Sequence, residues 1–125
     1  DINEELFDFQ RKYFDRSDWG SQIEQHLGDA VSIIPTINDV FDLVFIDADK
    51  ENYLNYFELI IGKMNSGGVI ISDNVLWSGK VLEEAKPNDL STKVLQEYNA
   101  FLKNDSRVET LVLPSRDGLT VCRVV

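Results

Sequence analysis

Two kinds of hydrophobic spacing alternate along the chain, and each predicts a different element. Apolar residues gather on one helix face in three segments, at residues 3–16, 51–64 and 91–103. Residues 30–37 predict a shorter helix, whose end is disturbed by Pro35. Five segments are predicted to be strands, at residues 22–27, 41–46, 69–72, 108–113 and 119–125.

The order of these elements predicts an open α/β sheet. The runs at 41–46 and 69–72 are almost wholly apolar, which is typical of parallel strands that are buried on both faces. We therefore expect helices on both sides of the sheet. Residues 115–118 have the composition of a tight turn, so the last two strands should form an antiparallel hairpin at the sheet edge. Between these elements, residues 75–90 are expected to form a loop.

Polar residues follow two of the buried strands directly. Asp47 comes after strand 41–46, and Asp73 and Asn74 come after strand 69–72. If the strands are neighbours, these side chains meet at the edge of the sheet where ligands bind. Two carboxylates and an amide form an all-oxygen set that suits Mg²⁺, Mn²⁺ or Ca²⁺ better than Zn²⁺. The alternative is structural, because Asp at such junctions often caps a helix and Asp-Asn is a common turn.

Three further side chains are candidates for chemistry or binding. Lys50 lies three residues after Asp47, and a nearby cation would favour its neutral amine, which can act as a general base. Its alternative is a solvated surface lysine. Trp77 would line a flat aromatic pocket or simply pack inside the protein. Asp29 follows a predicted strand and would bind a cofactor or cap the helix that begins at Ala30.

The composition restricts the partners that the chain can bind. It has 22 Asp and Glu against 12 Lys and Arg, a net charge of -10, which argues against binding nucleic acid or anionic membranes by bulk charge. No apolar run approaches the length of a membrane span. A single cysteine, Cys122, excludes an internal disulfide and favours the cytoplasm. Because the chain begins with Asp1 and not Met, we expect it to be a piece of a longer protein.

Three segments resemble one known family, the cation-dependent class I O-methyltransferases. They are FDLVFIDADKENY at 41–53, GGVIISDNVLWSG at 67–79 and LPSRDGLTVCRVV at 113–125. The family includes catechol and caffeoyl-coenzyme A O-methyltransferases and their bacterial relatives. The similarity covers essentially the whole chain, and the combination of DADKxxY with SDNVLW is highly specific. The resemblance implies a Rossmann-like sheet that binds S-adenosylmethionine (SAM).

The resemblance also implies a reaction and a set of roles. The reaction would be metal-dependent transfer of a methyl group from SAM to a hydroxyl of a small catechol-like acceptor. Asp47, Asp73 and Asn74 would hold the divalent cation, Mg²⁺ above all, and Lys50 would deprotonate the acceptor. Trp77 would lie beside the acceptor, and relatives are commonly homodimers. The cofactor-binding positions of the family fall on six residues: Asp1, Gly28, Asp29, Ala30, Asp47 and Asp49.

The chain also departs from the family. The glycine-rich loop that holds the methionine end of SAM is absent, and the relatives' strand order of 3-2-1-4-5-7-6 implies that strands 1 and 2 are absent too. We therefore expect residues 1–125 to be the C-terminal part of one methyltransferase domain, with poor affinity for SAM on its own. Two alternatives stay open: a tRNA hydroxyuridine O-methyltransferase of the same family, which the -10 charge disfavours, and a non-catalytic fragment or binding module.

Overall fold

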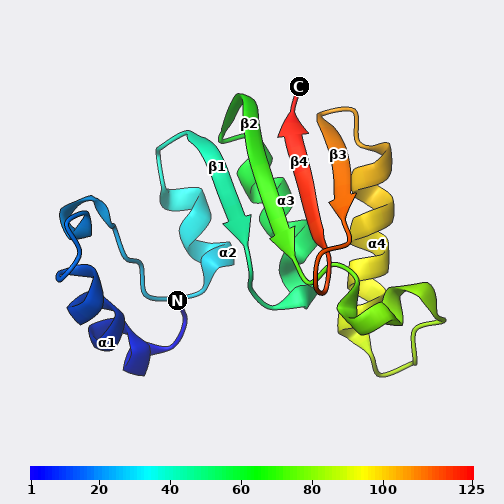
Figure 1. The fold of residues 1–125 in the computed structure, drawn as a ribbon, viewed down its shortest axis with the longest axis horizontal. Helices are drawn as coiled ribbons and strands as arrows, with labels where there is room; N and C mark the ends of the chain where they lie inside the picture. The colour runs from blue at the N-terminus through cyan, green and yellow to red at the C-terminus, as the bar shows by residue number, and fades with distance from the viewer. The chain divides into compact units, whose positions relative to one another are not determined.

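A computed structural model describes all 125 residues, which divide into two compact units. Unit 1 spans residues 1–38 and unit 2 spans residues 39–125 (Figure 1). The longest helix, α4 (Leu90–Asn104), has 15 residues. No helix combines the length and the apolar character that crossing a membrane requires.

Unit 2 is built on a mixed four-stranded sheet. Its strands are β1 (Phe41–Ile46), β2 (Met64–Asp73), β3 (Val108–Leu113) and β4 (Leu119–Val124). Their spatial order is β1-β2-β4-β3, with β1 parallel to β2 and β4 antiparallel to both of its neighbours. The predicted α/β sheet and its terminal hairpin are confirmed, and the order matches the 4-5-7-6 part of the family sheet.

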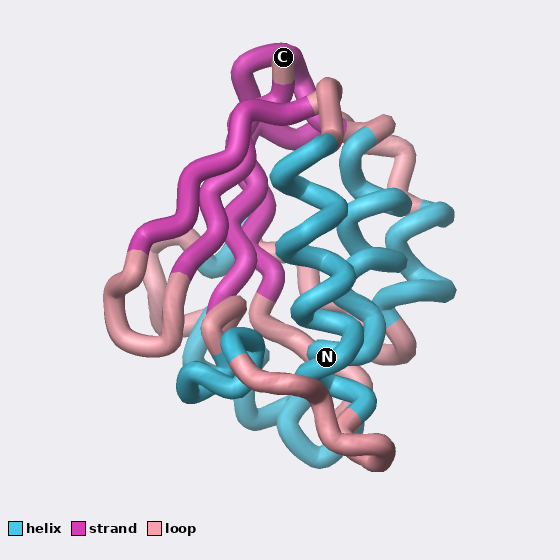
Figure 2. The backbone as a smooth tube through the Cα atoms, turned by 90° about the vertical axis from the view of Figure 1, so that its right-hand side faces the viewer, coloured by secondary structure: helices cyan, strands magenta, loops and turns pink.

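Two helices of unit 2, α3 (Tyr53–Ile61) and α4, lie on the same face of the sheet. Figure 2 shows the strands on one side and α4 on the other. Tyr98 of α4 and Ser72 of β2 share a buried hydrogen bond of 2.6 Å, and Tyr98 contacts Phe57 of α3 edge to face. The core between sheet and helices contains six large and fully buried side chains: Tyr53, Phe57, Ile70, Leu95, Tyr98 and Leu102.

The opposite face of the sheet is exposed in β1, so the prediction that this strand is buried on both faces is wrong. Leu43 and Phe45 of β1 are 62% and 57% exposed, although their apolar run predicted a strand buried on both faces. Leu111 of β3 is 58% exposed on the same face. The physical reason is the alternation of the strand: these side chains point away from α3 and α4, and no other part of unit 2 covers them.

Several predicted elements of unit 2 have different bounds. A short 3₁₀ helix, η3 (Lys50–Asn52), precedes α3, so the helix expected at 51–64 is shorter. Strand β2 begins five residues before the predicted run at 69–72, with an irregular register near its start. The expected loop at 75–90 contains a kinked 3₁₀ segment, η4 (Trp77–Leu82).

Unit 1 contains α1 (Glu4–Phe14), a 3₁₀ turn η1 (Gly20–Gln22), α2 (Ala30–Ile33) and a second 3₁₀ turn η2 (Ile34–Thr36). Asn3 caps α1 as expected, since its Oδ1 accepts the N–H of Glu5 at 3.0 Å. Pro35 lies in η2, so the helix expected at 30–37 changes to a 3₁₀ turn where the proline occurs.

The strand predicted at 22–27 is wrong. This segment is extended after η1, but it pairs with no strand. Its polar groups bond elsewhere in unit 1: Gln25 Nε2 donates to the carbonyl oxygen of Phe7 at 3.1 Å and to Gln10 Oε1 at 2.8 Å. Strand propensity alone cannot form a ladder without a partner strand to bond to.

Candidate active site

The polar ends of β1 and β2 meet around the amine of Lys50. Its Nζ lies 3.2 Å from Asn74 Oδ1, 3.4 Å from the carbonyl oxygen of Asp73 and 3.6 Å from Asp47 Oδ1. It also donates a hydrogen bond to the phenol of Tyr53. Residues that are far apart in sequence therefore come together at the carboxyl ends of two parallel strands, as expected for this class of sheet.

Lys50 is not a solvated lysine, because only 7% of its surface is exposed. It begins η3, which starts after residues 47–49 have followed the end of β1, and its amine contacts residues that follow both β1 and β2. Tyr53 beside it is fully buried. Burial, reinforced by the negative charge of Asp47, raises the pKa of Tyr53, so the phenol stays protonated and donates to the carbonyl oxygen of Asp73 at 2.8 Å. Tyr53 was not identified from the sequence as a site residue. Its position three residues after Lys50, which places the two side chains close together in a helical turn, could have indicated it.

The oxygen atoms in this cluster could hold a divalent cation. Asp47 and Asn74 each direct a side-chain oxygen toward the amine of Lys50. No three His, Cys, Asp or Glu side chains gather anywhere in a form that could hold a metal ion. A cation here would therefore need the amide of Asn74 together with the carboxylates of Asp47 and Asp73, which is the hard-oxygen set that Mg²⁺ prefers.

Asp49 is hydrogen-bonded by side chains of η3 and α3. Its Oδ1 accepts the hydroxyl of Tyr56 at 2.5 Å, and its Oδ2 accepts the amide of Asn52 at 2.5 Å. Partial burial opposes ionisation, but these hydrogen bonds outweigh it and hold the pKa of Asp49 below its usual range. The carboxylate is therefore ionised at neutral pH and can accept further hydrogen bonds.

Trp77 lines a cavity beside this cluster. The cavity has a volume of about 400 Å³. The indole ring centre lies 5.9 Å from Lys50 Nζ and 5.9 Å from Lys80 Nζ. The ring therefore lies near both the buried Lys50 and Lys80, which also lines the cavity. Its Nε1 is buried without a hydrogen-bond partner. The other lining residues come from η3, from residues 80–89 and from the start of α4: Glu51, Lys80, Lys86, Asn88, Asp89, Leu90 and Ser91.

The remaining cofactor candidates belong to unit 1. The amino nitrogen of Asp1 donates to the carbonyl oxygen of His26, and the N–H of Gly28 donates to the carbonyl oxygen of Asp1, both at 2.9 Å. The structure therefore brings Asp1 beside Gly28. Asp29 caps α2, which begins at Ala30, because its Oδ1 accepts the N–H of Val31 at 3.0 Å. Capping was the structural alternative for Asp29, and it leaves the second carboxylate oxygen near the surface.

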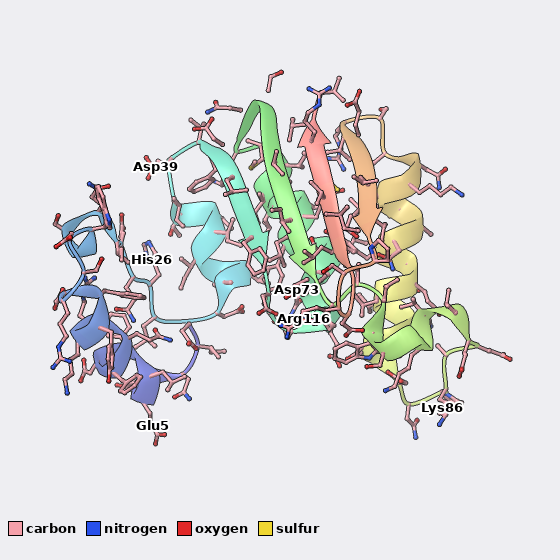
Figure 3. The ribbon with its side chains drawn as sticks, viewed as in Figure 1. Glu5, His26, Asp39, Asp73, Lys86 and Arg116 are labelled. Carbon is pink, nitrogen blue, oxygen red and sulfur yellow. The ribbon has the colours of Figure 1, made fainter.

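The acidic side chain of Asp1 is also ordered within unit 1. Its Oδ1 accepts the N–H of Asn3 and its Oδ2 accepts the amide of Gln10, each at 2.9 Å. Figure 3 shows the side chains of both units, with His26 in unit 1 and Asp73 and Arg116 at the lower end of the unit 2 sheet. The candidates thus form two groups, one in each unit.

Comparison with known proteins gives the family. The sequence profile of the O-methyltransferase family matches residues 1–125. Caffeoyl-CoA O-methyltransferase 1 of Arabidopsis thaliana is 32% identical over 98% of this chain and 52% of its own length. Caffeoyl-CoA O-methyltransferase of Petroselinum crispum is 34% identical over 98% of this chain and 56% of its own. The chain thus spans about half the length of these relatives.

Solved structures agree with this similarity. The O-methyltransferase from Bacillus cereus in complex with SAH has a TM-score of 0.92 and 27% identity, covering 100% of this chain and 60% of the neighbour. The O-methyltransferase TomG from Streptomyces achromogenes in complex with SAM has a TM-score of 0.92 and 25% identity, covering 98% of this chain and 59% of the neighbour. With a profile match over its whole length, the chain belongs to the O-methyltransferase family.

Proposed function

We propose that the protein carrying this chain transfers a methyl group from SAM to a hydroxyl of a small aromatic acceptor, with a divalent cation at Asp47, Asp73 and Asn74. The observation that carries the proposal is the buried amine of Lys50, which lies within 3.6 Å of the side-chain oxygens of Asp47 and Asn74 and of the backbone carbonyl oxygen of Asp73. Family membership and neighbours solved with SAM or SAH support the cofactor. Asp1, Gly28, Asp29, Ala30 and Asp49 are the proposed cofactor contacts.

The chemistry requires accurate placement more than covalent catalysis. Methyl transfer from a sulfonium is an in-line displacement, so the protein must hold the acceptor oxygen and the methyl carbon in line. When bound, the cation would orient the acceptor hydroxyl and lower its pKa. Lys50 Nζ, held by Tyr53 and Asn74, is placed to take up the hydroxyl proton. The ammonium that results is stabilised by Asp47 at 3.6 Å.

The cavity beside Trp77 supports a small acceptor. Its volume of about 400 Å³ lies at the lower end of the range for small-molecule sites, and the indole offers a flat face to an aromatic ring. A catechol-like diol would place two vicinal oxygens on the cation. The tRNA alternative is disfavoured by the net charge of -10. A non-catalytic fragment is disfavoured because Lys50 is buried among the proposed ligands. The homodimer and the cytoplasmic location expected from the sequence stay predictions.

The experiment is methyl transfer to catechol by the full-length protein, with and without Mg²⁺, followed by mass spectrometry of the product. We expect activity that EDTA abolishes and Mg²⁺ restores. Asp73→Ala and the milder Asp73→Asn should lose the activity while keeping SAM binding. Asp42→Ala is the matched control, because Asp42 lies near the start of β1, at the far end of the strand from the site, where its carboxylate accepts the amide of Asn65. Full activity in both Asp73 variants would contradict the proposed metal role.

A further inference from the structure

The backbone that follows β2 has an unusual conformation. Asn74, Trp77 and Ser78 have φ values of 60°, 50° and 55°, and Gly79 has 81°. Left-handed backbone crowds the Cβ atom of a non-glycine residue, so it persists only where the surroundings hold it. We call residues 74–79 the left-handed segment. It carries both a proposed cation ligand, Asn74, and the aromatic wall of the cavity, Trp77.

The turn of the β3–β4 hairpin holds this segment. The N–H of Val75 donates to the carbonyl oxygen of Gly118 at 3.2 Å, and the N–H of Leu76 donates to that of Asp117 at 2.9 Å. The side chain adds a third bond, because Asp117 Oδ1 accepts the N–H of Ser78 at 2.5 Å. Three residues of the left-handed segment, Val75, Leu76 and Ser78, are therefore bonded to two turn residues.

The contact is also close sterically. Gly118 has a φ of +82°, and a Cβ atom at this position would lie 2.5 Å from Leu76 Cγ. Glycine is thus required both by its backbone conformation and by the approach of the Leu76 side chain. On the other side, Asn99 Nδ2 of α4 donates to the carbonyl oxygen of Val75 at 2.9 Å. The left-handed segment is held between the hairpin turn and α4.

We infer that Asp117 is a positioning residue, which fixes the left-handed segment so that Asn74 and Trp77 keep their places beside Lys50. The inference rests on the proposed function, since it gives Asn74 and Trp77 their importance. Asn74 Oδ1 lies 3.2 Å from Lys50 Nζ, and the Trp77 ring centre lies 5.9 Å from it. Asp73 at the end of β2 pairs with Leu119, the residue that follows Gly118 of the hairpin turn.

The test compares Asp117→Ala with Asp117→Asn in the full-length protein. Alanine removes the acceptor for the N–H of Ser78, whereas asparagine keeps an acceptor oxygen of the same reach. We expect Asp117→Ala to bind Mn²⁺ about 10-fold more weakly by calorimetry without substrate, as is typical when a group that orients a ligand is lost. Asp117→Asn should restore the affinity. Asp105→Ala is the control, because it also removes a carboxylate that accepts a backbone N–H, that of Arg107.

Trp77 fluorescence, in a full-length background in which Trp19 and any other tryptophan are replaced by Phe, gives a readout that needs no metal. Asp117→Ala should shift the emission to longer wavelength and increase acrylamide quenching, and Asp117→Asn should not. Unchanged fluorescence in Asp117→Ala, or equal changes in both variants, would overturn the positioning role. If the parent protein binds no Mn²⁺, the proposed function fails on that result, while the fluorescence still decides the role of Asp117.

Discussion

The phenol of Tyr53 donates a hydrogen bond to the carbonyl oxygen of Asp73 at 2.8 Å, and so joins the start of α3 to the end of β2. The same phenol lies 3.4 Å from the carbonyl oxygen of Ile46, the last residue of β1. Its ring contacts Tyr98 edge to face, with centroids 5.6 Å apart. One buried side chain therefore connects the two strand ends that carry the candidate site.

Tyr53→Phe tests this connection, because it removes the hydroxyl and keeps the ring packing. We expect the free energy of unfolding to fall by about 1–2 kcal/mol, since a buried carbonyl loses its donor. The rate of methyl transfer should fall as well, because Lys50 loses a hydrogen-bond partner. Urea unfolding and kcat measure the two effects. Tyr13→Phe, which is 51% exposed, is the matched control and should change neither.

Lys50→Met tests the proposed base. Methionine has a similar length, so it fills the space of the buried Lys50 side chain while the amine is lost. We expect kcat to fall on the order of 100-fold to 10,000-fold, which is the range for loss of a general base. SAM binding should be retained in calorimetry. The exposed Lys103→Met in the last turn of α4 should keep full activity. A Lys50 variant with a normal kcat would remove the lysine from the mechanism.

Trp77→Leu tests the acceptor cavity. The change removes a flat aromatic face and keeps an apolar side chain, so it should raise KM for catechol by about fivefold to tenfold. The value of kcat should change less, because Lys50 and the proposed cation ligands are untouched. Trp19→Leu is the control, as Trp19 is 67% exposed in unit 1. Equal KM values in both variants would show that the acceptor binds elsewhere.

Protonation of Asp105 should make the protein less stable in acid. Hydrogen bonds from Arg107 hold the pKa of Asp105 below its usual range, and Arg107 also pairs with Glu58 of α3 at 2.6 Å. A carboxyl whose pKa is lower in the folded state stabilises the protein above its unfolded pKa of about 4. That stabilisation is lost as the pH falls through the lower, folded pKa.

Urea unfolding at pH 7 and pH 3 measures this dependence. Asp105→Asn should cost about 1 kcal/mol at pH 7, a modest effect because Arg107 is partly exposed. It should also reduce the difference in unfolding free energy between the two pH values. An identical pH dependence in Asp105→Asn would assign the acid sensitivity to other carboxylates.

The sequence was sufficient to predict that the ends of β1 and β2, which are followed by Asp47 and by Asp73 and Asn74, lie side by side. Parallel strands place their carboxyl ends at one edge, so polar residues that follow apolar runs must gather there. The burial of Lys50 could not be predicted, because it depends on the phenol of Tyr53 and on how α3 packs under the strands. Hydrophobic periodicity indicates which face of an element is apolar, but it does not indicate which polar side chains become buried against each other.

Other features depend on contacts that a sequence pattern does not contain. Residues 115–118 were predicted as a turn, but the hydrogen bond of Asp117 is made with Ser78, 39 positions away. Leu43 is apolar enough to be buried, yet its exposure depends on what covers that face of the sheet. Likewise the segment at 22–27 could become a strand only where a partner strand is available.

The 125-residue chain, taken alone, should bind SAM poorly. The sequence has no glycine-rich loop to hold the methionine end of the cofactor, and the chain covers 59% and 60% of two neighbours solved with SAM or SAH. Asp1 and Gly28 can supply only part of the contacts that such a cofactor needs. Calorimetric titration of the isolated chain should therefore show no binding at micromolar SAM, whereas the full-length protein in the same titration should bind. Micromolar affinity of the isolated chain would show that these 125 residues contain a complete cofactor site.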